Sequence, residues 1–166
     1  LLNRAIMGQY PPGSTFKTSQ ALTFLQEGVI TPSTSFPCSH GFHFGHLKVG
    51  CHGHPSPLNL APAIATSCNG YFCWGLYYMF GNRKKYKSVQ DAMTRWKDYM
   101  VSMGFGYKLG IDLPGEKRGM IPNAQFYDKA YRGSWNGLTV ISISIGQGEV
   151  NLTPLQIANL GATIAN

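Results

Sequence analysis

The chain has 166 residues, of which 43% are hydrophobic and only 13% are charged. That length suits a single domain or one large piece of a domain. The low charge, with 9 Phe, 9 Tyr and 3 Trp residues, excludes intrinsic disorder. No stretch is apolar for long enough to span a membrane, and the first residues do not form a signal-peptide pattern. Both ends look like cuts through structure, so we expect a fragment of a longer protein.

Helices dominate the predicted elements of the first half. A helix is expected over residues 14–27, with Gly28 as its C-terminal stop. Prolines, glycines and histidines predict an irregular excursion over 29–57. Two short helices are expected to follow, over 58–66 and 70–80.

The clearest amphipathic helix of the second half covers residues 88–103. A glycine- and proline-rich loop follows over 104–123. Alternating isoleucine and serine predict a strand over 138–145. Thr153, followed by proline and then glutamine, marks the start of a last helix. Helices with a few strands are thus expected.

The net charge is +7, which favours acidic partners. The basic residues are scattered, however, apart from one cluster over 83–87. No nucleic-acid-binding motif accompanies that cluster, so we interpret it as a solvated loop and expect no nucleic-acid partner.

Three of the four cysteines, Cys38, Cys51 and Cys68, lie in a stretch that also holds all five histidines. Thiolate and imidazole suit Zn²⁺, but the spacing matches no standard zinc template. A zinc site, a Cys38–Cys51 disulfide and free buried thiols therefore all stay open. Cys73 lies in an aromatic run and is expected in the core.

Two short patterns could carry chemistry. Ser14 and Lys17 are one helical turn apart at the start of the first expected helix. A serine nucleophile needs a nearby base, and a lysine can serve where its surroundings keep some amine neutral. Ser67 and Asn69, near a break between two helices, offer a proton relay and an amide for a substrate. Each pattern alone is weak, since a helix cap or an exposed lysine explains it equally well.

Together and in this order, the two patterns match the first two motifs of penicillin-binding proteins and serine β-lactamases. The sequence resembles the transpeptidase domain of class B penicillin-binding proteins, most closely the cell-elongation type. The stretches that carry the resemblance span nearly the whole chain and are Leu2 to Ala5, Gln9 to Lys17, Ser67 to Asn69 with Tyr71 and Phe72, Gly110 to Glu116, Ser144 to Glu149, and Leu152 to Gln156.

The resemblance implies an α+β fold of the penicillin-binding transpeptidase and serine β-lactamase kind, with a helical part and an antiparallel sheet, here truncated. It implies a peptidoglycan D,D-transpeptidase that cross-links stem peptides ending in D-Ala-D-Ala. Ser14 would be the nucleophile, Lys17 its base, Ser67 a proton shuttle and Asn69 a substrate-binding residue. β-Lactam antibiotics would acylate Ser14, and catalysis would need no cofactor.

The family's third motif, Lys-Ser/Thr-Gly, is absent from these residues. Residues 1–166 are therefore expected to be a partial transpeptidase domain, without the pedestal and the membrane anchor. Activity is expected of the longer protein rather than of the fragment alone. The resemblance places that protein at the periplasmic face of the bacterial inner membrane, with the cell-elongation machinery as its partner.

Alignment with metal-bearing relatives puts His52 and Cys68 on ligand positions. Cys38 and Cys51 would complete a structural zinc site, with His46 and His54 as substitutes for His52. A zinc-binding interaction module is one alternative function. A serine β-lactamase is disfavoured because no glutamate follows Ser67 in a suitable pattern, and the stretch over 144–156 argues against a non-catalytic β-lactam sensor.

Overall fold

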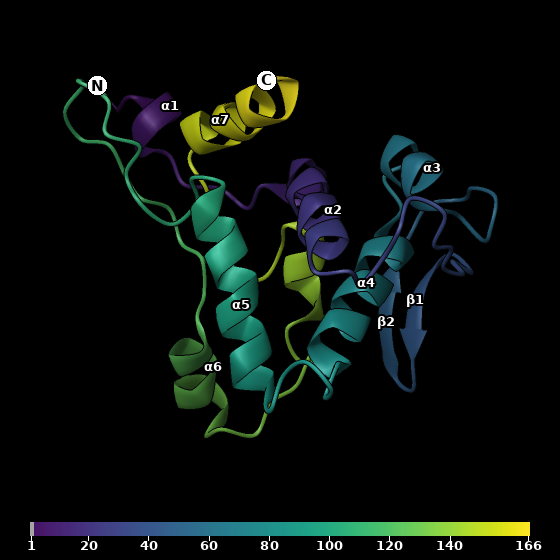
Figure 1. Ribbon diagram of the computed structural model, residues 1–166. Coiled ribbons are helices and arrows are strands. Elements are labelled where there is room, and N and C mark those ends of the chain that lie inside the picture. Colours follow the sequence, from purple (N-terminus) through teal and green to yellow (C-terminus); the bar gives the residue numbers. More distant parts are fainter. Residues whose placement is uncertain (1) are drawn as a thin grey trace.

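A computed structural model describes residues 2–166 (Figure 1). The elements in chain order are α1 (Arg4–Met7), the 3₁₀ helix η1 (Gly13–Phe16), α2 (Lys17–Gln26), β1 (Gly41–Phe44), β2 (Leu47–Gly50), α3 (Leu60–Ala65), α4 (Asn69–Gly81), α5 (Val89–Ser102), α6 (Ala124–Tyr131), the 3₁₀ helix η2 (Ile141–Ile145) and α7 (Pro154–Ala165). Among these residues no helix has the length and apolar character needed to cross a membrane.

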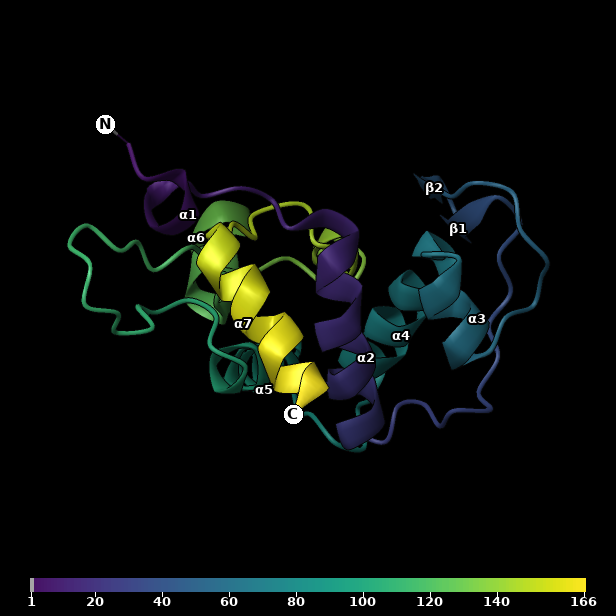
Figure 2. The same ribbon diagram turned by 90° about the horizontal axis from the view of Figure 1, so that it is seen from above.

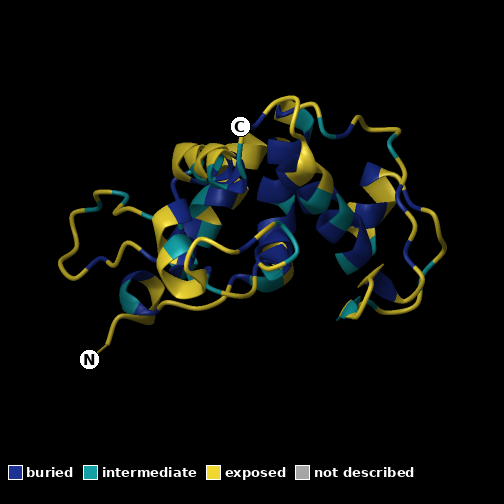
Figure 3. Cartoon of the chain, turned by 90° about the horizontal axis from the view of Figure 1, so that it is seen from below, coloured by how far each residue is buried: buried dark blue, intermediate teal, exposed yellow. Residues whose placement is uncertain are grey.

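Helix α4 is the centre about which the other elements pack. Its sequence is apolar on every side, as expected of a helix that is covered all round, and most of its residues are buried. It contacts α2, α5, η2 and strand β1 (Figure 1). Burial is concentrated on the facing sides of these helices, whereas the long connecting loops are largely exposed (Figure 3). Packing in the hydrophobic core therefore fixes the position of α4, including its first turn.

The two strands form an antiparallel hairpin beside α4, in which Gly41 pairs with Gly50 and Phe44 with Leu47 (Figure 1). Phe42 anchors the hairpin, because its buried ring packs on Trp74 of α4 with 4.7 Å between ring centroids. This hairpin lies within the stretch over 29–57, which the sequence predicts to be irregular throughout. The prediction is therefore wrong for residues 41–50.

Helix starts are the best-predicted features of the chain. The Ser88 hydroxyl accepts the Asp91 N–H at 3.2 Å, which places the start of α5 as expected. Thr153 and Gln156 form the reciprocal cap that begins α7. Helix α7 lies alongside α2 (Figure 2), and the groove between them is lined by apolar residues of α7 and by threonines of η1 and α2. Helix α6, which the sequence analysis does not predict, begins at a similar cap, where Asn123 accepts the Phe126 N–H at 2.8 Å.

The strand predicted over 138–145 is wrong, because residues 141–145 form the 3₁₀ helix η2. The alternation of isoleucine and serine suggests one buried and one exposed face. In the fold, however, Ser144 is as buried as the isoleucines on either side. Its hydroxyl donates to the Ile141 carbonyl at 2.7 Å, which satisfies both polar groups inside one helical turn. The apolar residues of this segment are therefore explained by burial in the core, and not by a strand with one exposed face.

Glu27 fixes the C-terminal end of α2. Its side chain is 1% exposed and forms ion pairs with Lys85 at 2.5 Å and with Arg95 at 2.8 Å. The hydroxyl groups of Tyr86 and Tyr99 donate to the same carboxylate. Burial by itself would raise the pKa of Glu27, but the hydrogen bonds from these four partners outweigh it and lower the pKa to about 2.

We expect Glu27→Gln to lower the free energy of unfolding at neutral pH by about 3 kcal/mol, the value that corresponds to the depressed pKa. Because the pKa of Glu27 is lower in the folded state, its contribution is complete above pH 4.5 and disappears as the pH falls toward 2. Urea unfolding of both proteins between pH 7 and pH 2 measures this. Asp98→Asn, at an exposed position on α5, is the control and should change little. Equal pH dependence of the wild type and the Gln variant would contradict the prediction.

Candidate active site

Ser14 lies in the turn of η1, and Lys17 is the first residue of α2. Ser14 is exposed, whereas Lys17 is 3% exposed. A reactive hydroxyl on the surface thus lies beside an amine in the interior. The two helices run on without a break, so both residues lie at the positive, N-terminal end of a helical segment.

The end of η2 supports this turn from behind. The Gly13 N–H donates to the Gly146 carbonyl at 2.9 Å. Gly146 has φ +70°, and a Cβ atom there would lie 2.2 Å from the Gly13 carbonyl oxygen. Only glycine permits so close an approach between two backbones. Gly146 belongs to a stretch that carries the family resemblance, but its contact with the serine turn could not be foreseen from sequence.

Four oxygen atoms surround the Lys17 amine. Nζ lies 3.2 Å from Ser14 Oγ and 2.9 Å from Ser67 Oγ. It also lies 2.6 Å from the Ser67 carbonyl oxygen and 2.6 Å from Asn69 Oδ1. The fold therefore brings together all four residues that the two sequence patterns single out.

The chemistry of these oxygens determines which proton can move. The Ser67 carbonyl and Asn69 Oδ1 can only accept, so each takes one N–H of Lys17. The third position on the nitrogen faces two hydroxyls, which can either donate or accept. A protonated amine donates its third N–H there, and a neutral amine offers its lone pair. The arrangement therefore fits an amine that exchanges one proton with a serine hydroxyl.

The surroundings favour the neutral form of Lys17. Its pKa is lowered because burial deprives the ammonium of water, and this effect outweighs the opposing influence of charge on the nearby cysteines. The Phe72 ring is fully buried and has its centroid 5.9 Å from Nζ, which closes one side of the amine to solvent. A lysine of lowered pKa is suited to act as a base.

Ser67 reaches Lys17 through a strained backbone. Its φ of +53° lies in the left-handed region, which costs a non-glycine residue about 1–2 kcal/mol. Ser67 joins the end of α3 to the start of α4, and both its carbonyl and its hydroxyl contact Nζ. Strain of this kind is typical of functional sites.

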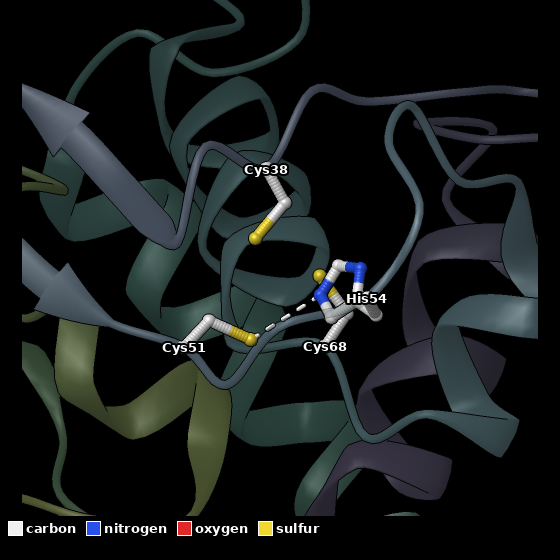
Figure 4. Close-up of side chains that lie close together, drawn as sticks. All are labelled: Cys38, Cys51, His54 and Cys68. Atoms are coloured by element: carbon white, nitrogen blue, oxygen red, sulfur yellow. Dashed lines mark hydrogen bonds between the residues drawn. The ribbon is translucent and has the colours of Figure 1, made fainter.

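A second cluster of chemically active side chains lies next to the second motif. The ligand atoms of Cys38, Cys51, His54 and Cys68 all lie within 4.8 Å of one another, and the four side chains point toward a common centre (Figure 4). Cys51 Sγ is 3.4 Å from His54 Nε2. All four cysteines of the chain are free. This group could hold a metal ion.

Three of the four predicted ligands are thus in the cluster, but His54 takes the place predicted for His52. His52 and His46 are both exposed and lie outside the group. Cys51 immediately precedes His52, whereas the turn that follows brings His54 back toward the sulfur. Burial by itself would raise the pKa of the Cys51 thiol, but hydrogen bonds, chiefly those with the backbone N–H of Asn69 and with His54, outweigh it and lower the pKa.

The whole chain, residues 1–166, matches the model of the penicillin-binding protein transpeptidase domain, and the chain therefore belongs to that family. "Peptidoglycan D,D-transpeptidase MrdA" of Acinetobacter baumannii is 36% identical over 173 residues, which cover 100% of this chain and 24% of that protein. The chain spans about a quarter of the length of the curated relatives that it matches.

Solved structures give the same result. Penicillin-binding protein 2 of Helicobacter pylori matches 99% of this chain and 30% of its own, with a TM-score of 0.84 and 30% identity. Its complex with MreC matches 94% of this chain and 28% of its own, with a TM-score of 0.77 and 30% identity. The expected fold, and the expected likeness to the elongation type, penicillin-binding protein 2, are confirmed.

Proposed function

We propose that this chain is the part of a peptidoglycan D,D-transpeptidase that carries the nucleophile Ser14 and its base Lys17. The observation that carries the proposal is the buried Lys17 amine, which contacts Ser14, Ser67 and Asn69 at once. The names of the relatives support the reaction class.

The geometry supports a two-step acyl transfer. Lys17 takes the proton of Ser14 while Oγ attacks the penultimate D-Ala carbonyl of a stem peptide. The peptide bond breaks, the terminal D-Ala leaves as an amine, and the proton returns to it through Ser67, whose hydroxyl also contacts Lys17. An amine of a second stem peptide then attacks the ester, forms the cross-link and releases Ser14. Asn69 binds the amide of the donor peptide.

The same geometry accounts for inhibition by β-lactams. Their strained amide takes the place of the peptide bond, and Ser14 opens the ring to form an ester. Since the leaving group stays attached to the acyl chain, the acceptor amine cannot take its place. Serine acyl transfer of this kind uses side chains alone and needs no cofactor.

The remaining parts of the machinery belong to a longer protein in this proposal. Residues 1–166 form a partial transpeptidase domain, and a Lys-Ser/Thr-Gly strand outside them completes the site. The longer protein acts at the periplasmic face of the inner membrane, held there by an anchor, together with the cell-elongation machinery. The solved complex of a relative with MreC supports such a partner.

The nucleophile is tested by covalent labelling of the longer protein. A fluorescent penicillin should label the wild type. Ser14→Ala should abolish the label, because the other hydroxyl on the Lys17 amine, that of Ser67, is less exposed and serves as the proton relay in this proposal. Gel fluorescence and peptide mapping measure this. Thr18→Ala removes a hydroxyl on α2 outside the site and should label like the wild type. Label that persists in Ser14→Ala would refute the assignment.

The base is tested by substitution and by pH. Lys17→Ala should slow acylation by about a hundredfold to ten-thousandfold, the usual contribution of a general base. Lys17→Arg should fail as well, because a guanidinium stays protonated. Since the base acts as the neutral amine, the wild-type rate should rise with pH through the lowered pKa of Lys17. Stopped-flow acylation from pH 6 to pH 10 measures this, with Lys84→Ala in the exposed loop as control. A near-normal rate in Lys17→Ala would assign the base elsewhere.

We further propose that Cys38, Cys51, Cys68 and His54 hold a structural zinc ion. Three thiolates and one imidazole are a donor set that zinc prefers, and a tetrahedral ion needs its ligands about this close together. Bound there, the ion would tie the loop before β1 and the turn after β2 to the start of α4. Its role would be structural.

Metal analysis tests this site. Protein purified without chelator should carry one zinc ion, and His54→Ala should lower the zinc content. His52→Ala is the matched control, because it removes an exposed histidine two residues away and should keep the metal. Absence of zinc, with two thiols missing from a free-thiol count, would decide for the Cys38–Cys51 disulfide.

A further inference from the structure

Asn69 is held from two sides by the end of strand β2. Its side-chain Nδ2 donates to the Gly50 carbonyl at 2.8 Å, and its backbone N–H donates to Cys51 Sγ at 3.3 Å. Gly50 and Cys51 are consecutive residues where β2 leaves the hairpin. Two consecutive residues therefore contact Asn69, Gly50 through its carbonyl and Cys51 through its sulfur.

The first contact fixes the orientation of the Asn69 amide. Oδ1 accepts from Lys17 Nζ, and Nδ2 donates to Gly50. If the amide rotated by half a turn, two donors would face each other at Lys17 and two acceptors at Gly50, so both bonds would be lost. One N–H of Nδ2 is used by Gly50, which leaves the other for a ligand.

The second contact fixes the position of the backbone. Asn69 is the first residue of α4, so its N–H has no acceptor within the helix. Cys51 supplies that acceptor from outside, while the Cys68 sulfur accepts the Tyr71 N–H at 3.3 Å. Two sulfur atoms therefore cap the helix that begins with Asn69.

We propose that Gly50 and Cys51 form a clamp that positions Asn69, with Cys51 as a positioning residue for the proposed reaction. The clamp holds the Asn69 amide so that Oδ1 faces Lys17 and the free N–H faces the carbonyl of the donor stem peptide. This inference rests on the proposed function. It assigns Cys51 a role in addition to metal binding, because its sulfur also accepts the Asn69 N–H at 3.3 Å.

The experiment compares Cys51 with Cys38, a neighbour in the cluster with no hydrogen bond to Asn69. Both variants, Cys51→Ala and Cys38→Ala, are studied in the longer protein as purified. Each removes one proposed zinc ligand, so that metal loss affects them equally. Acylation by a chromogenic cephalosporin gives the binding constant and the acylation rate separately. Hydrogen–deuterium exchange of peptides that span residues 67–72 reports on the Asn69 N–H without any chemistry at Ser14.

We expect Cys51→Ala to lower the second-order acylation constant by about tenfold or more relative to Cys38→Ala, since misplacement of a positioning group costs up to about a hundredfold. The loss should fall mainly on binding, because Asn69 holds the substrate before and during the reaction. Exchange at 67–72 should be faster in Cys51→Ala than in Cys38→Ala. Cys51→Ser keeps an acceptor and should restore both readouts. Cys51→Val, which keeps the volume without the acceptor, replaces Cys51→Ala if the latter does not fold.

Equal acylation and equal exchange in the Cys51 and Cys38 variants would overturn the clamp and leave the proposed function standing. Wild-type protein that is not acylated at Ser14 would overturn the proposed function, and with it the substrate role of the clamp, even where exchange shows the Asn69 N–H to be protected.

Discussion

The buried amine of Lys17 is the group on which the arrangement of the site depends. A charge that leaves water must find polar partners in the protein, and an amine with four oxygens around it can be buried at little cost. Those oxygens come from two segments, the serine turn before α2 and the junction between α3 and α4. Any movement of one segment against the other would separate Lys17 from the three oxygens of Ser67 and Asn69. The need to satisfy one nitrogen therefore holds two motifs together that are 50 residues apart in sequence.

Helix α2 carries a second buried charge at its other end, and the two charges act on different neighbours. Lys17 binds the start of α4, whereas Glu27 binds α5 and the loop before it. Between them, buried Gln20 accepts the indole N–H of Trp96 at 2.8 Å. Apolar packing alone would permit small sliding motions along the helix axis. Polar contacts at both ends and in the middle fix its position along that axis as well, as the proposed role of Lys17 as the base for Ser14 requires.

Local signals in the sequence were enough for the parts of the fold that local chemistry decides. The caps at Ser88 and Thr153 predict two helix starts, and the three-residue spacing of Ser14 and Lys17 places both on one helix face. The predictions that are wrong concern features that depend on contacts between residues distant in sequence. The strand over 138–145 was wrong because α4 and the serine turn bury both sides of that segment. The choice between His52 and His54 depends on how the chain turns after β2, and the contact of Cys51 with Asn69 depends on where the hairpin docks.

The placement of the second motif at the start of a helix follows from these constraints. A side chain inside a helix is fixed by neighbours on every side, and those neighbours would fill the space that a substrate needs. At the first turn, the backbone N–H groups lack partners within the helix, so atoms from outside can fix the residue from behind. Here the sulfur atoms of Cys51 and Cys68 accept two of these N–H groups, and the strained φ of Ser67 turns its carbonyl toward Lys17. Ser67 and Asn69 are thereby held through their backbones, and their side chains are only half-buried.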